Sequence, residues 1–169
     1  MSDVRRRIER RIADDPGIHV NQLVRELDLA AGQVQYHLRR LTDADAVAAA
    51  ALFGRTHYYP PEYDAWERRA LALLRRETSA EIVATLLEAG PSRPVDVADR
   101  VGIARSTLAW HVDRLTAAGL VEKRRDGHRL VVADDRRTAE LLEEADPTLP
   151  ARLVDRYTRL VDLLVEDTG

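Results

Sequence analysis

Apolar residues recur along this chain first at helical spacing and then in alternation, and the same order appears twice. Nine positions match across a constant offset of 74 residues without a gap. The first set is Leu23, Leu27, Leu29, Val34, Tyr36, His37, Leu38, Leu41 and Val47. It falls on Val97, Val101, Ile103, Leu108, Trp110, His111, Val112, Leu115 and Val121. One duplication of this size is typical of two small domains, because a solenoid needs more copies with a shorter period.

The first copy predicts three helices followed by two strands. In chain order we expect a helix over 4–12, a short helix ending at Leu27, a helix over 31–43, and strands over 47–52 and 56–59. Asp15-Pro16-Gly17 is a turn signal that ends the first helix, and Asn21 is the expected N-cap of the second. The two strands are predicted to join at Phe53-Gly54-Arg55.

The second copy predicts the same elements in the same order. We expect a helix from a capping box at Thr78 and Glu81 to about Gly90, a short helix around Val97, a helix over 105–117, and strands over 121–125 and 128–132. Asp126-Gly127 between the strands is a strong signal for a two-residue hairpin.

Helix, helix, tight turn, helix and hairpin is the order of a winged helix-turn-helix. The predicted fold class is therefore mainly α with small β-hairpin wings (α+β), in two tandem winged-helix domains with a linker helix and a C-terminal helix. We expect domain 1 over 1–61, a linker helix within 62–77, domain 2 over 78–133, and a helical tail over 134–169.

The third predicted helix of each copy also carries a family resemblance. The segments Gln33–Leu41 and Ser106–Leu115 resemble the third-helix signature of ArsR/MarR-like winged-helix regulators. The whole layout, with Arg55-Thr56-His57-Tyr58-Tyr59-Pro60 between the copies, is similar to tandem winged-helix transcriptional regulators of haloarchaea. The resemblance implies a DNA-binding regulator.

The helical period separates an inward face of each third helix from an outward face that suits a DNA groove. With Val34, Leu38 and Leu41 turned inward, the outward residues of the first copy are Gln33, Gln35, Tyr36, Arg39 and Arg40. Their counterparts in the second copy are Arg105, Ser106, Thr107, Trp110 and Arg114. Glutamine pairs with adenine, and arginine with guanine or phosphate. Asp113 stands where the first copy has Arg39, which weakens that face for phosphate.

The hairpins differ in their basic content. Cationic candidates for a phosphate or the minor groove in the second hairpin are Lys123, Arg124, Arg125 and Arg129, with His128 beside them, whereas the first hairpin offers only Arg55 and His57. Five arginines of the first helix, Arg5, Arg6, Arg7, Arg10 and Arg11, favour a solvated helix face over phosphate contact. The five histidines are scattered, so we expect structural roles and no metal site.

Charge and composition narrow the function class. The chain has 169 residues, no cysteine and a net charge of −3, and the ten acidic residues of the tail outnumber its five arginines. Both copies are mildly basic, which suits a polyanionic partner. The longest apolar run, 46–53, is too short to span a bilayer, and no export signal opens the chain. We expect a cytoplasmic protein without a cofactor and without a catalytic motif.

The tail predicts a final helix with a coiled-coil type of seam, formed by Leu149, Leu153, Tyr157, Leu160 and Leu164. Pairing with a second chain as a homodimer is preferred over packing on domain 2. The favoured function is sequence-specific recognition of double-stranded DNA in transcription regulation. The alternatives are a tandem winged-helix protein adaptor of chromosome or transcription machinery, and a nucleoid-coating protein without sequence preference.

Overall fold

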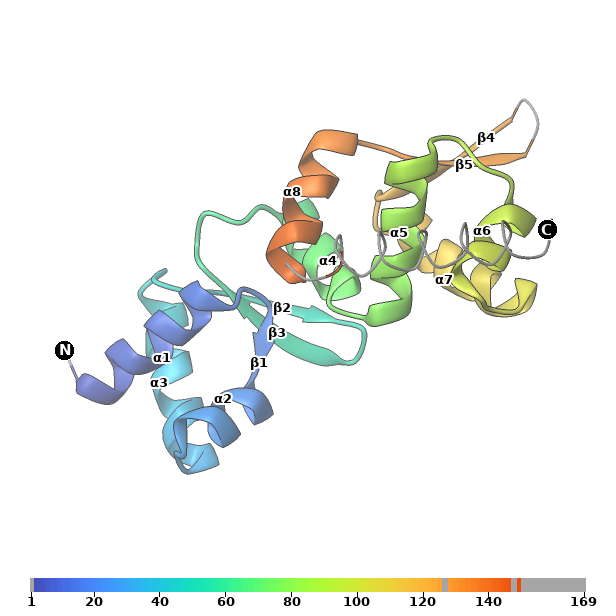
Figure 1. Cartoon of the computed structure of the whole chain (residues 1–169). Coiled ribbons are helices and arrows are strands. Elements are labelled where there is room, and N and C mark those ends of the chain that lie inside the picture. Colours follow the sequence, from blue (N-terminus) through green and yellow to red (C-terminus); the bar gives the residue numbers. More distant parts are fainter. Residues whose placement is uncertain (1, 126–127, 147–148, 150–169) are drawn as a thin grey trace. The chain divides into compact units, whose positions relative to one another are not determined.

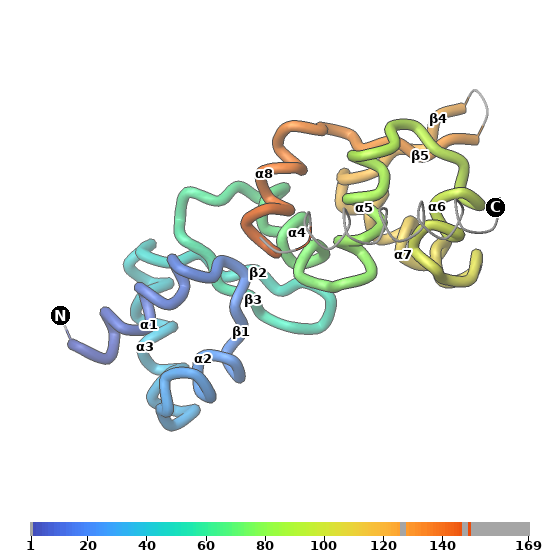
Figure 2. The backbone as a smooth tube through the Cα atoms, in the orientation of Figure 1, coloured from blue at the N-terminus to red at the C-terminus, as the bar shows by residue number. Residues whose placement is uncertain are grey.

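The chain divides into two compact units, Met1–Ala72 and Leu73–Gly169. The computed structural model describes residues 2–125, 128–146 and 149. Figure 1 labels the elements, and Figure 2 follows the backbone in the same orientation.

The first unit is a helical domain with a three-stranded antiparallel sheet. Its elements are α1 (Asp3–Asp14), β1 (Ile18–His19), α2 (Val20–Leu27), α3 (Ala31–Asp43), β2 (Ala48–Leu52) and β3 (Arg55–Tyr59). The strand order is β1-β3-β2. One core of apolar side chains, each at most 3% exposed, joins them: Ile8, Ile12, Ile18, Leu23, Val34, Leu38, Leu41 and Val47. The helical spacing of these residues in the sequence is what turns α1, α2 and α3 toward one centre.

Two arginines of α1 fasten α2 rather than only solvating their helix. The Nε of Arg11 lies 2.6 Å from Oε2 of Glu26, and its Nη2 lies 3.1 Å from Oδ2 of Asp15. Arg7 donates from Nη2 to the carbonyl of Leu27 at 3.1 Å. The hydrogen bond from Arg11, helped by one from Gln22, lowers the pKa of Glu26 below its usual value. These contacts fix the angle at which α2 meets α1.

The start of α2 differs from the prediction. Asn21 is not the N-cap, because the helix begins two residues earlier than expected, at Val20, and His19 caps it. The backbone N–H of Gln22 donates to Nδ1 of His19 at 3.3 Å. A histidine ring nitrogen replaces the more common side-chain oxygen in this role. The same residue belongs to β1, a strand that the sequence pattern did not predict because it has only two residues.

The turn before the third helix is built alike in both copies. Asp28 after α2 has φ +51°, and Gly102, its counterpart 74 positions later, has φ +78°. Each left-handed residue lets the next amide reach back, from Leu29 to the Val24 carbonyl at 3.3 Å and from Ile103 to the Ala98 carbonyl at 3.1 Å. This closing of the helix end sets the angle of the helix-turn-helix.

The first hairpin turns through Phe53 and Gly54, since Leu52 pairs directly with Arg55. Both turn residues have positive φ, +53° and +79°. That is the geometry of a type I′ turn, in which asparagine is favoured at the first position and a bulky residue is strained.

Replacing Phe53 with asparagine is expected to raise the free energy of unfolding of the first unit by about 1 kcal/mol, because asparagine tolerates the left-handed conformation. Native-state hydrogen exchange of residues in this unit measures the change. Phe53→Ala is the control, since it removes the ring without supplying a better turn residue. A lower stability of Phe53→Asn than of Phe53→Ala would contradict this interpretation of the turn.

The predicted linker helix within 62–77 and the helix expected after it both form, with slightly different bounds. The helix α4 (Ala65–Leu74) ends before Arg75, and α5 (Glu77–Ala89) begins two residues later. Arg76 is the N-cap of α5 and has extended backbone angles, so the expected capping box at Thr78 and Glu81 is wrong. Both residues lie inside the helix, one and four positions after its first residue.

The second unit repeats the architecture of the first. After α5 come α6 (Pro94–Val101), α7 (Arg105–Ala117), β4 (Val121–Arg124), β5 (Arg129–Val132) and α8 (Asp135–Ala145). Ser92 forms an isolated antiparallel bridge with Leu130, in the place that β1 takes in the first unit. The buried apolar residues, no more than 5% exposed, include Ile82, Val83, Leu86, Val97, Leu108, Val112, Leu115, Leu120, Val121, Leu130 and Val132.

The third helices of the two copies match the prediction closely. The bounds of α3 and α7 are those expected from the sequence, and the predicted strand positions agree to within two residues. The mainly helical winged-helix fold class is confirmed. The predicted turn at Asp126-Gly127 lies outside the described residues. So do Leu153, Tyr157, Leu160 and Leu164 of the expected dimer seam, whereas Leu149 is 1% exposed within the single chain.

Candidate nucleic-acid interface

The outward face of α3 is polar, basic and open. Burial of Val34, Leu38 and Leu41 on one side of the helix leaves all five predicted contact residues exposed on the other: Gln33, Gln35, Tyr36, Arg39 and Arg40. In the part of the chain that the structure describes, no side-chain hydrogen bond or ion pair occupies any of them. Their donors and acceptors are therefore available to base edges or phosphates.

The corresponding face of α7 carries Asp113 in the position of Arg39. Arg105, Ser106, Thr107 and Trp110 are exposed, but Arg114 is only half-exposed. The expectation that Arg114 projects as freely as Arg40 needs correction, because its guanidinium carbon lies 4.0 Å from the centroid of the Trp110 ring. Stacking on the indole face holds this side chain against the helix surface.

Each third helix presents one aromatic ring at the same repeat position. Trp110 is 49% exposed and Tyr36 is 52% exposed. The Trp110 ring lies between Arg114 and the edge of His111, whose ring centroid is 4.8 Å away. Tyr36 has a looser version of the arrangement, with Arg40 at 5.9 Å and His37 at 5.2 Å. These contacts orient the rings while leaving their outer faces open.

The histidine next to each aromatic ring lies at the inner edge of its helix. His37 is 8% exposed, and its buried Nδ1 has no hydrogen-bond partner within the described residues. In the second unit, Nδ1 of His111 lies 3.3 Å from the hydroxyl oxygen of Ser79 on α5. Partial burial, followed by the positive charges of Arg114 and Arg76, lowers the pKa of His111 from its ordinary value near 6.5. Across the described residues, no three metal-ligating side chains gather around either histidine.

The lowered pKa of His111 predicts a pH-dependent stability for the second unit. The folded state binds the proton more weakly than the unfolded state, so stability is full above about pH 6.5 and falls as the pH drops from there toward the lowered pKa. Hydrogen exchange of the second unit is expected to show this loss, and His111→Gln should flatten it. An NMR titration that places the pKa of the His111 ring above its ordinary value would contradict the prediction.

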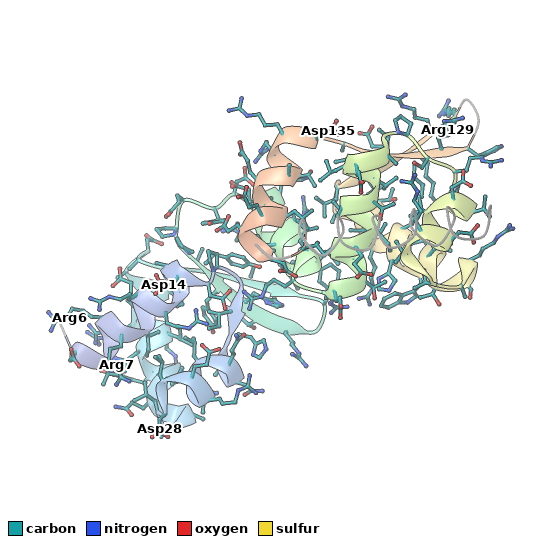
Figure 3. The ribbon with its side chains drawn as sticks, viewed as in Figure 1. Arg6, Arg7, Asp14, Asp28, Arg129 and Asp135 are labelled. Atoms are coloured by element: carbon teal, nitrogen blue, oxygen red, sulfur yellow. The ribbon has the colours of Figure 1, made fainter. Side chains whose placement is uncertain are left out.

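The hairpin of the second unit carries exposed cations on several sides. Lys123, Arg124, Arg125 and Arg129 are all exposed. Nζ of Lys123 lies 3.6 Å from Oδ1 of Asp113, the acid that replaces the arginine of the first copy. Both partners are well exposed, so water screens the pair and it contributes little to stability. Arg129, labelled in Figure 3, donates to the Pro91 carbonyl at 3.2 Å.

The hairpin of the first unit offers a smaller basic surface. Arg55 is exposed, and its Nη1 lies 3.4 Å from Nε2 of His19. His57 is half-buried, and its Nδ1 lies 2.8 Å from the Gly17 carbonyl. That contact holds β3 against the turn after α1, so His57 is a structural residue. The sequence held no local signal for this role of His57, because His57 and Gly17 are 40 positions apart.

These features define the class: two helix-turn-helix units, each with an exposed third helix and a β-hairpin. The chain matches a family model described as an N-terminal HTH domain over residues 2–71, and one described as winged helix-turn-helix DNA-binding over residues 75–122. Residues 2–71 are therefore similar to an N-terminal helix-turn-helix domain and residues 75–122 to a winged helix-turn-helix DNA-binding domain, which confirms the resemblance of the third helices.

One curated relative is an uncharacterized HTH-type transcriptional regulator, MJ1398, from Methanocaldococcus jannaschii. It is 28% identical over 131 residues, which cover 78% of this chain. The match spans about a third (33%) of the length of that relative.

Two solved structures show weaker likeness. A MarR family protein from Bacillus stearothermophilus is 18% identical with a TM-score of 0.39, and covers 81% of this chain and 94% of its own. The transcriptional regulator Tm0710 from Thermotoga maritima is 22% identical with a TM-score of 0.37, and covers 62% of this chain and 72% of its own.

Among the described residues, no helix has the length and apolar character needed to cross a bilayer.

Proposed function

We propose that this protein regulates transcription by binding double-stranded DNA in a sequence-dependent manner. In this proposal α3 and α7 enter major grooves, and the hairpin cations bind the backbone beside them. The observation that carries it is the outward face of α3, where Gln33, Gln35 and Arg40 are exposed and make no side-chain hydrogen bond or ion pair within the described residues. Glutamine and arginine side chains pair with base edges, and Gln33 and Arg40 lie in one line along the helix with Gln35 beside it.

In this proposal the two units make different kinds of contact with DNA. The first unit supplies most of the base contacts through α3. The second supplies more backbone attraction through Lys123, Arg124 and Arg125, which cluster at its hairpin. A homodimer bound to a symmetric site is part of the proposal and rests on the predicted seam of the tail. A cytoplasmic location, where the chain has access to DNA, is also part of the proposal.

Selection from a random duplex pool, followed by fluorescence anisotropy of the full chain, tests the proposal. We expect one enriched sequence that binds at least about a hundredfold more tightly than its scrambled version. Affinity should fall steeply with salt, because phosphate contacts release counterions. Equal affinity for selected and scrambled duplexes would favour the nucleoid-coating alternative. Absence of any duplex binding at moderate salt would favour the protein adaptor, which the Asp113–Lys123 pair and the low net charge support.

A further inference from the structure

The exposed Trp110 ring and the guanidinium of Arg114 form a stacked pair on the outer face of α7. The two residues are four positions apart, so they lie on the same side of the helix. The guanidinium carbon of Arg114 lies over the indole, 4.0 Å from the ring centroid. The rings of Trp110 and His111 meet in a T-shaped arrangement, with their centroids 4.8 Å apart. Both contacts limit the rotation of the indole, although the residue is 49% exposed.

The first copy holds the equivalent pair more loosely. Tyr36 and Arg40 occupy the same repeat positions, but the guanidinium carbon lies 5.9 Å from the ring centroid, near the outer limit of a cation–π contact. Arg40 is exposed, whereas Arg114 is only half-exposed. The two third helices therefore present the same row of positions with a different degree of order. The arginine is fixed on its ring in α7 and is held only weakly in α3.

A guanidinium stacked on a ring suits two neighbouring base pairs. Arginine binds guanine through O6 and N7, and apolar side chains contact the 5-methyl group that thymine presents in the major groove. Consecutive bases of one strand are about 3.4 Å apart along the helix axis. The 4.0 Å between Arg114 and the Trp110 ring is close to this spacing. A guanidinium that lies against a guanine therefore brings the indole next to the adjacent base pair, where a methyl group offers apolar contact.

We propose that Trp110 and Arg114 together read one dinucleotide, a thymine next to a guanine, in the major groove. Arg114 binds O6 and N7 of the guanine, and Trp110 contacts the 5-methyl group of the thymine. Trp110 is also a positioning residue, because its ring fixes the guanidinium before DNA binds and so lowers the cost of ordering it. This base preference of α7 rests on the proposed DNA-binding function.

Uracil in place of single thymines of the selected duplex tests the methyl contact, because it removes only the 5-methyl group. Anisotropy titrations measure the affinity of the full chain for each duplex. We expect uracil to weaken binding about fourfold at a thymine beside a guanine, which is the effect of one buried methyl group. Trp110→Ala should bind both duplexes equally, and Trp110→Phe should keep part of the difference because it keeps an aromatic face. Tyr36→Ala is the matched control from the first copy, since it changes overall affinity but should leave this uracil effect intact.

The neighbouring guanine tests the contact of Arg114 and the positioning role of Trp110. 7-Deazaguanine at this position removes only the N7 acceptor, and we expect it to weaken binding by the parent chain about fivefold or more. Arg114→Ala should abolish this effect, whereas Arg40→Ala should retain it. Trp110→Ala should reduce the effect although Arg114 is present, and Trp110→Phe should restore it. An undiminished effect in Trp110→Ala would show that the ring does not position the guanidinium.

Other results would overturn the base preference and leave the proposed function standing. One is a selected sequence in which no thymine lies next to a guanine. Another is binding that favours the selected duplex over its scrambled version but is insensitive to uracil at every thymine. A uracil effect that persists in Trp110→Ala would equally exclude contact between this ring and the methyl group. If the chain binds no duplex at moderate salt, the proposed function fails and the base preference fails with it.

Discussion

Replacing Arg40 with alanine is expected to weaken binding to the selected duplex by about five- to 150-fold, which corresponds to the loss of one bidentate contact with a base pair. Arg40 lies on the exposed face of α3, and within the described residues its side chain makes no hydrogen bond or ion pair and approaches the Tyr36 ring centroid only loosely, at 5.9 Å. Little internal structure is lost with it. The variant should therefore fold normally and show relaxed preference at a single base pair rather than uniformly weaker binding.

Anisotropy titrations against the selected duplex and single-position variants measure this effect. Arg136→Ala on α8 is the charge-matched control, since its side chain is 89% exposed and pairs only with Glu140 on its own helix in the described structure. If Arg40→Ala binds every duplex as tightly as the parent chain, α3 does not read bases through this residue. If it weakens all duplexes equally, Arg40 contacts phosphate instead.

Removing the three cations of the second hairpin together, as Lys123→Ala, Arg124→Ala and Arg125→Ala, is expected to act differently. The three residues are exposed, and their charge attracts phosphate regardless of sequence. The slope of log affinity against log salt should become shallower by about three, with similar losses on selected and scrambled duplexes. Titrations over a range of salt concentrations give the slope. An unchanged slope would show that the hairpin does not contact DNA phosphates.

The sequence pattern was sufficient to predict the elements that bury a regular apolar face. Leu23, Val34, Leu38 and Leu41 recur at helical spacing, and they lie together in the core with α3 at its predicted bounds. The duplication added independent evidence, because each copy supports the assignment of the other. The open face of α3 follows from the same period, since the residues between the buried positions lie on the opposite side of the helix.

The features that the sequence did not predict depend on other kinds of interaction. His19 caps α2 with a ring nitrogen, which is not among the usual capping side chains, and α5 has Arg76 as its N-cap in place of the expected Thr78. Arg114 is held by a ring four positions away on its own helix, so its exposure depends on a rotamer rather than on the period.

Amide chemical-shift mapping of the full chain with its selected duplex tests the central claim most directly. The account predicts that the largest shifts fall on the outer faces of α3 and α7, at Gln33, Tyr36, Arg40, Thr107 and Trp110, and on the second hairpin. Saturating duplex that leaves both third helices unshifted, while perturbing another surface, would contradict it.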